Sequence, residues 1–381
     1  MTDIPYIKRK IGQSYLVWFQ NSNLYFQLEE PAWFVFQELV RDNQPESIAS
    51  ELEQRYGWTP EESLTFVSEI RFRVDQMNQP LAIGSDSDPE PDFAQAAQHN
   101  FNSSSGYSYR LGTRVIRFSF ETPWLERYIH PLISHLEAPG NEGEAILFEL
   151  FTFQEQVVFR SNKEVRGIWG TDESHLVKGM VFLELINVLH QKKKEDWLMT
   201  VHASAITNGR KTILFSAAPG SGKTTLAALL RAQGYHLISD DFVPFDKFSM
   251  NAYPFPIAMS VKEGSMEVLT SYYPELAGKQ LREVAPNKKV RYLPIENDLM
   301  QLIFPVKEII FVKYNPAIDF QLDQLDFYEA LRLLLEQVWV PPTPGNVEIL
   351  FDRVADLSFY QLNYSDNSKA LEAINQLFAN D

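Results

Sequence analysis

The sequence predicts an α/β domain built around a phosphate-binding loop, preceded by a small domain of one β-hairpin and three helices. Three observations support this prediction. The stretch "SAAPGSGKTT", residues 216–225, lies between a strand-like apolar run and a helix-like run, which is the order found in P-loop proteins. The first 80 residues alone hold a hairpin signal and three helical patterns. Residues 84–105, which separate the two parts, are rich in Asp, Pro and Ser and poor in apolar residues, as linkers are.

Length and composition limit the classes of protein to consider. A chain of 381 residues with 45% hydrophobic residues is long enough for two or three globular domains. Its net charge of −16 argues against nucleic acid as a partner, because proteins that bind nucleic acid concentrate positive charge. The absence of cysteine excludes disulfides, thiolate metal sites and a cysteine nucleophile. The sequence shows no signal peptide and no apolar run long enough to span a membrane, so we expect a cytoplasmic protein without a membrane partner.

We expect the small domain to occupy residues 1–83. Apolar residues on both sides of "QNSN" predict a hairpin over 14–28. Helical spacing of apolar residues follows, and the second helix is expected over 45–56. The third helix begins at a predicted capping box, in which Thr59 is the N-cap and Glu62 is the third helical residue.

A larger domain is expected over residues 106–381, after a linker over 84–105. Its first part, residues 106–196, is predicted to be α+β. Strands are expected in "TRVIRFSF" and "QEQVVFRSNKEVRGIW", with a helix interrupted by Pro131 between them and a second helix over 176–189. Residues 197–381 form the predicted nucleotide-binding core.

A second hairpin is predicted immediately before the phosphate-binding loop. Asn208-Gly209 lies between two apolar runs, and this pair favours a two-residue type I′ turn. With that turn, His202 lies opposite Phe215, at the rim of the site. The alternative is a histidine that is packed in the strand without a functional role, but the position beside the loop favours the functional interpretation.

The loop matches the P-loop template G-x-x-x-x-G-K-[ST] except at its first position, where Ala217 replaces glycine. The template predicts that Lys223 contacts the β- and γ-phosphates and that the Thr224 hydroxyl binds Mg²⁺. The N-terminus of the following helix adds main-chain N–H groups and a partial positive charge. The nucleotide is expected to be ATP, or another nucleoside triphosphate, with Mg²⁺. The predicted nucleotide-binding residues are Pro219, Gly220, Ser221, Gly222, Lys223, Thr224 and Thr225.

Two adjacent carboxylates, Asp240 and Asp241, end the next predicted strand, "YHLISDD". Mg²⁺ prefers one or two carboxylates together with phosphate oxygens. A second carboxylate can accept the proton of an attacking hydroxyl, as in phosphoryl transfer by kinases. Because neighbouring residues on a strand point to opposite faces, we expect the two aspartates to have different roles. The pattern alone does not say which aspartate has which role.

Taken together, these residues resemble the HPr serine kinase/phosphorylase family and its HPr-kinase-related members, which share a core with phosphoenolpyruvate carboxykinases. The resemblance covers about residues 197–375 and rests on His202, the loop and "SDD". Downstream segments that also fit are "PFPIAMSVKEGSMEVL", "NKKVRYLPIE", "KEIIFVKY" and "FYQLNYSD". The resemblance implies a P-loop kinase domain of the HPr kinase/phosphoenolpyruvate carboxykinase type.

The resemblance also implies roles for the site residues. His202 is expected near the γ-phosphate, and Lys223 and Thr224 on phosphate and Mg²⁺. Asp240 is implied as the general base and Asp241 as the metal ligand. The chain departs from the family at Ala217, and at Ala218 it lacks the acidic residue of the HPr enzymes. The family's downstream signature for phosphorolysis is not found either, so a forward kinase is expected. A homo-oligomer is a further implication of the resemblance.

The N-terminal domain is similar to PqqD-like peptide-recognition domains, through the patterns "NSNLYFQLEEPAWFVFQEL" and "IASELEQRYG". This similarity implies a winged-helix-like fold that binds the leader of a ribosomally synthesised peptide as an added strand. A packing or dimerisation domain is the alternative. The resulting hypothesis is an ATP-dependent P-loop kinase that phosphorylates a serine hydroxyl of a peptide or small protein, which the N-terminal domain captures. A small-molecule kinase and a nucleotide-binding sensor without transferase activity are the other hypotheses. The donor could also be GTP or pyrophosphate.

Overall fold

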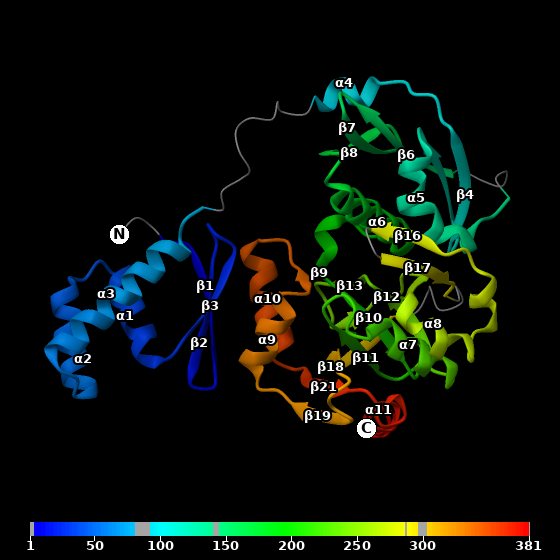
Figure 1. Cartoon of the computed structure of the whole chain (residues 1–381). Coiled ribbons are helices and arrows are strands. Elements are labelled where there is room, and N and C mark those ends of the chain that lie inside the picture. Colours follow the sequence, from blue (N-terminus) through cyan, green and yellow to red (C-terminus); the bar gives the residue numbers. More distant parts are fainter. Residues whose placement is uncertain (1–3, 81–91, 140–144, 286–287, 296–302, 381) are drawn as a thin grey trace. The chain divides into compact units, whose positions relative to one another are not determined.

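The computed structural model describes residues 4–80, 92–139, 145–285, 288–295 and 303–380. The chain divides into two compact units (Figure 1). The first unit contains residues 1–89 together with 340–355, and the second contains residues 90–339 together with 356–381. No helix within the described ranges is long and apolar enough to cross a lipid bilayer.

The first unit begins with an antiparallel sheet in the order β1-β2-β3, followed by three helices. The strands are β1 (Tyr6–Ile11), β2 (Ser14–Phe19) and β3 (Leu24–Leu28), and the helices are α1 (Glu30–Val40), α2 (Pro45–Tyr56) and α3 (Pro60–Met77). The predicted hairpin and the three predicted helices are confirmed, whereas the sequence pattern did not predict β1. The capping box is also confirmed, because Thr59 accepts from the Glu62 N–H and Glu62 accepts from the Thr59 N–H.

A helix from the far end of the chain completes the first unit. This helix, α10 (Pro344–Val354), contacts β1 (Figure 1). Asp352 on α10 pairs with Arg9 on β1, and the Phe351 ring lies 6.0 Å from the Tyr25 ring on β3. The predicted domain boundary at residue 83 therefore leaves out one helix of this unit. Sequence proximity could not reveal it, because about 250 residues separate α10 from the rest of the unit.

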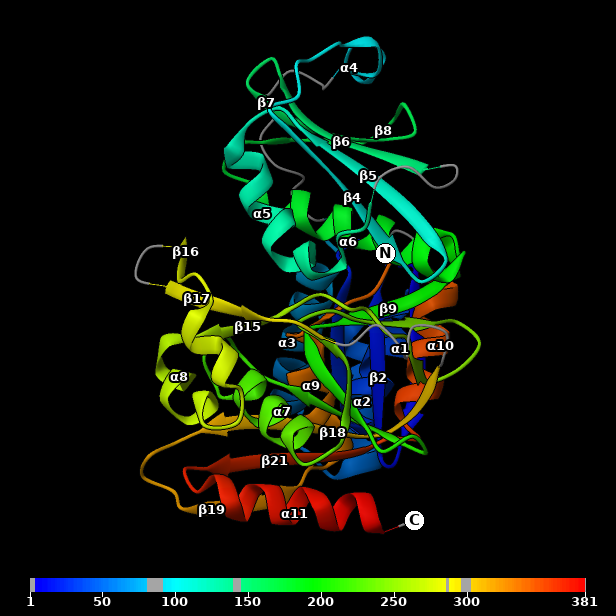
Figure 2. The same ribbon diagram turned by 90° about the vertical axis from the view of Figure 1, so that its right-hand side faces the viewer.

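The second unit opens with a five-stranded sheet in the order β4-β5-β6-β7-β8. Helices α5 and α6 lie on the side of this sheet that is turned toward the large sheet of the same unit (Figure 2). Pro131 lies in the last turn of α5 and does not interrupt the helix, contrary to the prediction. The elements are β4 (Ser105–Leu111), β5 (Arg114–Phe120), α5 (Pro123–Ile133), the 3₁₀ turn η1 (Ser134–Leu136), β6 (Ala145–Phe153), β7 (Gln156–Ser161), β8 (Glu164–Gly170) and α6 (Ser174–His190).

The predicted linker over 84–105 is partly ordered secondary structure. Its residues before 92 lie outside the described ranges, but α4 (Phe93–Gln98) follows and β4 begins at Ser105. Arg160 on β7 donates hydrogen bonds to the main-chain oxygens of Ala97 and His99 at 2.9 and 3.0 Å. These contacts fix α4 to the sheet through main-chain atoms. Composition does not reveal contacts of this kind, which explains why a linker was predicted there.

The nucleotide-binding core predicted from the sequence is built on a ten-stranded sheet. Its main path is β12-β10-β11-β18-β14-β13-β9-β20, and β21 pairs with both β18 and β19. The strands β11, β18 and β21 are parallel neighbours. The strands are β9 (Trp197–Val201), β10 (Ala203–Thr207), β11 (Thr212–Ser216), β12 (His236–Asp240), β13 (Val243–Asp246), β14 (Asn251–Ala252), β18 (Phe304–Tyr314), β19 (Phe320–Gln324), β20 (Val338–Trp339) and β21 (Ser358–Tyr364).

Helices and a small third sheet surround this core. The small sheet has the order β15-β17-β16, with β15 (Met259–Lys262), β16 (Arg282–Ala285) and β17 (Lys288–Leu293). The remaining elements are η2 (Lys194–Asp196), α7 (Lys223–Ala232), α8 (Glu263–Thr270), η3 (Pro274–Gly278), α9 (Phe327–Leu335) and α11 (Asn367–Ala379). Buried residues of α5, α6 and the five-stranded sheet form one cluster with Trp197, Phe255 and Ile257. Residues 106–196 therefore share a hydrophobic core with the part of the chain that follows them.

The hairpin before the predicted phosphate-binding loop exists, but its predicted register is wrong. Strand β10 pairs with β11 through Thr207↔Thr212 and Ser204↔Phe215, so the loop has four residues, 208–211. The Asn208 side chain accepts hydrogen bonds from the main-chain N–H groups of Arg210 and Lys211, at 2.9 and 3.0 Å. This side-chain turn replaces the two-residue type I′ turn.

Candidate functional site

The stretch 216–225 forms a loop between β11 and α7, in the strand–loop–helix order that the sequence predicts. Gly220 and Gly222 have φ values of +95° and +92°, which favour glycine. At Gly222 a Cβ would also lie 2.8 Å from the hydroxyl of Tyr364. Ala217, by contrast, is buried and does not have a positive φ, so the alanine at the first template position introduces no backbone strain.

Lys223 is the first residue of α7 and is buried. Its Nζ lies 3.1 Å from Nε2 of His202 and 3.3 Å from Oδ1 of Asp241. Three chemically different groups therefore meet at the N-terminus of a helix, where main-chain N–H groups and the helix dipole favour an anion. The sequence predicted each of these residues, and the structure brings them together.

His202 reaches the loop by a route that the sequence did not predict. It lies in the bend between β9 and β10 rather than opposite Phe215. Its main-chain N–H donates to the oxygen of Gln337 at 2.8 Å, and its Nδ1 donates to the main-chain oxygen of Asp241 at 3.2 Å. With the proton on Nδ1, Nε2 is free to accept from Lys223, which specifies a neutral imidazole. Burial lowers the pKa of His202, and the Lys223 charge lowers it further against the opposing effect of Asp241.

Asp240 is buried at the end of β12 and faces Thr224. The Thr224 hydroxyl lies 3.3 and 3.5 Å from the two carboxylate oxygens of Asp240. Ser204 on the neighbouring strand β10 also donates a hydrogen bond to Asp240. Burial raises the pKa of the Asp240 carboxyl above its ordinary value, although the Lys223 charge opposes this shift. The carboxylate is thus held against the residue that the P-loop template assigns to Mg²⁺.

Asp241 points in a different direction from Asp240, but for a reason other than the predicted strand alternation. Strand β12 ends at Asp240, and Asp241 has a φ of +75°. This left-handed conformation turns its carboxylate toward Lys223 and His202, and 41% of the side chain is exposed. Burial of its remaining surface raises the pKa of Asp241, but the charges of Lys223 and Lys178 outweigh that effect and hold the pKa below its usual range.

The other predicted nucleotide-binding residues lie in the same loop. Ala218, Pro219 and Gly220 are exposed, and Ser221 donates its main-chain N–H to the oxygen of Ala218. The hydroxyl of Thr225 forms a hydrogen bond with Ser265 on α8, so this side chain ties the loop helix to its neighbour. Thr225 therefore has a structural contact in addition to any contact with a nucleotide.

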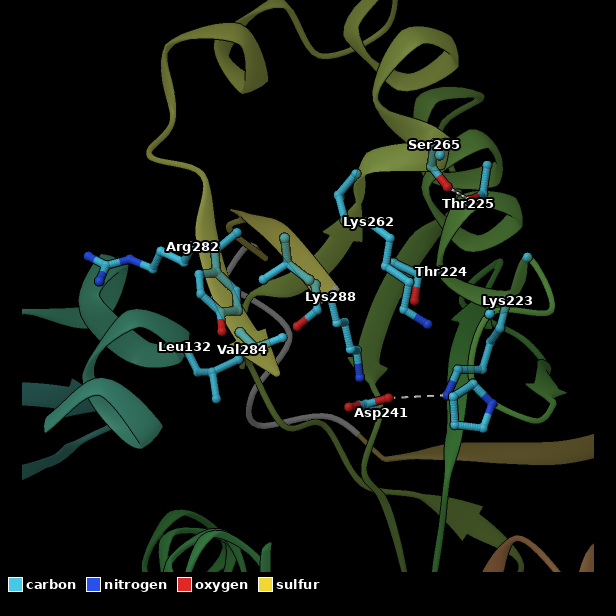
Figure 3. Close-up of a pocket in the computed structure, with 18 of the residues that line it drawn as sticks. Leu132, Lys223, Thr224, Thr225, Asp241, Lys262, Ser265, Arg282, Val284 and Lys288 are labelled. Carbon is cyan, nitrogen blue, oxygen red and sulfur yellow. Dashed lines mark hydrogen bonds and ion pairs between the residues drawn. The ribbon is translucent and has the colours of Figure 1, made fainter. Parts of the chain in front are cut away.

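A cavity of about 1030 Å³ opens beside the loop (Figure 3). Residues of α5, α6, β15, β16 and β17 form its other walls, together with the loop and Asp241. The sequence interpretation missed three lysines in these walls, namely Lys178, Lys262 and Lys288, and it missed Ser204. The lysines come from three separate elements and fit no motif, so only the tertiary fold could reveal them. Ser204 follows His202 by two residues, and correct pairing of β10 with β12 would have identified it.

A scan against protein-family models and a search of curated proteins find no match to this chain. Within the described part of the chain, three or more His, Cys, Asp or Glu side chains do not gather into a metal-binding group. Magnesium in nucleotide sites needs fewer protein ligands, because phosphate oxygens and water complete its coordination.

Proposed function

We propose that this protein is an ATP-dependent P-loop kinase that phosphorylates a serine hydroxyl of a peptide or small protein. One observation carries the proposal. Lys223, at the N-terminus of α7, lies within 3.3 Å of both His202 and Asp241, and the next residue, Thr224, faces Asp240. Phosphoryl transfer needs little covalent chemistry from the protein. It needs cations and N–H groups around the phosphates, a magnesium site and a group that receives the hydroxyl proton, and these five residues can supply all of them.

Thr224 and Asp240 fit a Mg²⁺ ion. In P-loop enzymes the ion is held by the loop Ser or Thr and by a carboxylate at the end of a neighbouring strand. Here Asp240 ends β12, and its oxygens lie at the long end of hydrogen-bond distance from the Thr224 hydroxyl, as expected for two groups that can share an ion. When bound, Mg²⁺ would neutralise charge that develops on the β- and γ-phosphate oxygens.

We propose Asp241 as the general base, which reverses the order that the family resemblance implies for the two aspartates. Asp240 is buried against Thr224 and Ser204, whereas Asp241 lines the cavity and is partly exposed. Only a group on the cavity wall can meet the hydroxyl of an incoming acceptor. As the acceptor oxygen bonds to the γ-phosphorus, its proton passes to Asp241. The bond to the bridging oxygen breaks, and ADP leaves with the electron pair.

Lys223 and His202 would act on the transferring phosphoryl group. The Lys223 ammonium lies between the imidazole and the Asp241 carboxylate, so a γ-phosphate bound there meets a cation from the helix start. His202 is neutral in this arrangement and becomes a hydrogen-bond donor at Nε2 only when protonated. We therefore assign it to the stabilisation of charge that appears during transfer.

The first unit supports a peptide acceptor over a metabolite. In the described structure β3 pairs only with β2, so its other edge offers main-chain groups to an added strand. Peptide recognition by strand addition uses such an edge, with side-chain pockets on alternate positions. Leu24 on β3 is 43% exposed, which provides an apolar position at this edge.

Transfer of ³²P from γ-labelled ATP to serine peptides tests the proposal. The full-length protein is incubated with Mg²⁺ and a serine peptide library, and the product is examined by phosphoamino-acid analysis. Parallel reactions use GTP and pyrophosphate as donors, and Lys223→Ala serves as the inactive control. Phosphoserine that appears with wild type and not with Lys223→Ala supports the kinase. Binding of ATP without transfer to any peptide would favour a sensor, and transfer to a metabolite alone would favour a small-molecule kinase.

A further inference from the structure

Three lysines besides Lys223 surround Asp241 in the cavity. Lys178 comes from α6, Lys262 from the end of β15 and Lys288 from the start of β17. None of the three forms an ion pair with Asp or Glu among the residues that the structure describes. Figure 3 shows Lys262 and Lys288 extending from the small sheet toward Asp241, while Lys223 approaches from the loop.

The Lys288 charge acts on both of the other lysines. Burial lowers the pKa of Lys178, and the Lys288 charge lowers it further, while Asp241 opposes both effects. Burial and the Lys288 charge likewise lower the pKa of Lys262. Lys178 and Lys262 are partly buried, whereas Lys288 is exposed, and the Lys178 ammonium lies 5.1 Å from the centroid of the Phe182 ring. Partly buried cations without a carboxylate partner are unfavourable, so Lys178 and Lys262 call for an anion, and Lys288 adds positive charge beside them.

The nucleotide phosphates account for part of this cluster. The charges of Lys288, Asp241, Lys223 and Asp240 all act on Lys262, so Lys262 is the one of the three lysines that also lies near the loop lysine. The charges that act on Lys178 are those of Asp241, Lys288 and Asp240. Lys178 is carried by α6, which lines the cavity together with α5. Lys178 and Lys288 therefore lie beside the proposed general base, where the acceptor binds.

Building on the proposed kinase function, we propose that the acceptor carries an anionic side chain next to its reactive hydroxyl, and that Lys178 and Lys288 bind this group. The anion is a carboxylate of Asp or Glu, or the phosphate of a residue that is already phosphorylated. Charge-assisted hydrogen bonds to lysine suit both groups. The chain as a whole, with its net charge of −16, repels such an acceptor, so local cations are needed at the point of binding.

Matched peptides test this preference. Each contains one serine followed by Glu, by Gln or by phosphoserine, in an otherwise identical sequence. The full-length enzyme is assayed with γ-labelled ATP, and binding of the same fluorescent peptides is measured by anisotropy with MgADP present. We expect kcat/KM and affinity to be about 10–100-fold higher for the anionic peptides than for the Gln peptide, since a hydrogen bond to a charged group contributes roughly that factor. Comparison of the Glu and phosphoserine arms identifies the source of the anion.

Substitutions of single lysines locate the binding group. Lys178→Gln and Lys288→Gln should remove most of the preference for the anionic peptides, through KM, while leaving nucleotide affinity within about twofold. Lys178→Arg should retain the preference for the anionic peptides. Lys289→Gln is the matched control, because Lys289 adjoins Lys288 on β17 and is exposed but does not line the cavity.

The outcomes separate this inference from the kinase proposal. Equal activity with Glu and Gln peptides would overturn the inference and leave the kinase standing. An equal loss of ATP affinity and peptide affinity in Lys178→Gln would also overturn the inference, because Lys178 would then bind the nucleotide. Binding that depends on the anion and on Lys178, without phosphate transfer, would support the subsite and refute the kinase. Absence of both binding and transfer would overturn both.

Discussion

The two aspartates should give opposite changes in stability as well as different losses of activity. Asp241→Asn removes the partner of Lys223, and the two charged atoms lie 3.3 Å apart. Coulomb's law at this distance gives an attraction of about 1 kcal/mol in water and about 5 kcal/mol at an effective dielectric constant near 20. Because 41% of the Asp241 side chain is exposed, solvent screening favours the lower part of this range, about 1–2 kcal/mol. The corresponding fall in Tm is about 2–8 °C.

Asp240→Asn should leave the Tm of the nucleotide-free protein unchanged or raise it. Burial raises the pKa of this carboxyl, so its charged form opposes folding at neutral pH. A group whose pKa is raised on folding contributes stability only while it is protonated, and that contribution is lost as pH rises through the folded-state pKa. The advantage of the asparagine variant should therefore disappear below the ordinary pKa of aspartate, about 4.

Activity and binding complete this test. Asp241→Asn should reduce single-turnover phosphoryl transfer by about 10²–10⁴-fold, the range typical of a lost general base, and should retain MgADP binding. Asp240→Asn should weaken MgADP binding, and added Mg²⁺ should partly restore it. The measurements are thermal unfolding at pH 7 and pH 4, calorimetric titration of MgADP, and rapid-quench transfer to a peptide. If Asp240→Asn binds MgADP normally and only loses transfer, the roles are those implied by the family resemblance and our reassignment is wrong.

Other substitutions probe the same site and the first unit. Lys223→Ala should abolish turnover while the Tm changes by a few degrees at most, and circular dichroism with an ATPase assay would expose an unfolded variant. His202→Ala should lower kcat more than nucleotide affinity; unchanged specific activity with a lower Tm would indicate a packing role only. Gly222→Ala should destabilise the loop by roughly 1–3 kcal/mol, because alanine is strained at a φ of +92° and its Cβ meets the Tyr364 hydroxyl. Adding Tyr364→Phe should recover only the contact part of that loss, and full recovery would show that the backbone is not strained. Deletion of residues 1–89 should lower solubility, because it removes the surface of the first unit that α10 contacts. A monomeric, monodisperse product in light scattering would contradict this prediction.

Local signals predicted most of the elements that hold the site. The loop sequence, the helix that ends near Gly234 and the strand before Asp240 were all identified correctly, because each depends on neighbouring residues. The capping box at Thr59 was also predicted correctly, since two side chains three residues apart define it. Structural features that depend on about ten neighbouring residues could therefore be predicted from the sequence.

Register and long-range packing were not accessible in the same way. The pair Asn208-Gly209 favours a two-residue turn by itself, but the Asn208 side chain closes a four-residue loop instead. Lys211, at the end of that loop, is buried and its Nζ donates to Glu308, 97 residues away. A tertiary contact thus decides a local register, and the shift of two residues moved the predicted position of His202. The different directions of Asp240 and Asp241 were expected, but the left-handed φ of Asp241 that produces them was not.

Helix α10 complicates any experiment that removes the first unit. It belongs to the first unit by its contacts, yet it is joined within the chain to β20 and β21 of the second unit. Strand β21 carries Tyr364, whose hydroxyl lies 2.8 Å from the position that a Cβ at Gly222 would take. Strand β20 pairs with β9, which ends one residue before His202. The connections at the two ends of α10 therefore lead into the strands that hold His202 and the loop. Removal of the first unit tests capture of the peptide and support of the site at once, so a point substitution of an exposed residue on β3, such as Leu24→Lys, separates the two better. This substitution removes the exposed apolar position on the edge strand and leaves α10 in place. A higher KM for the peptide with unchanged basal ATP hydrolysis would then report capture alone.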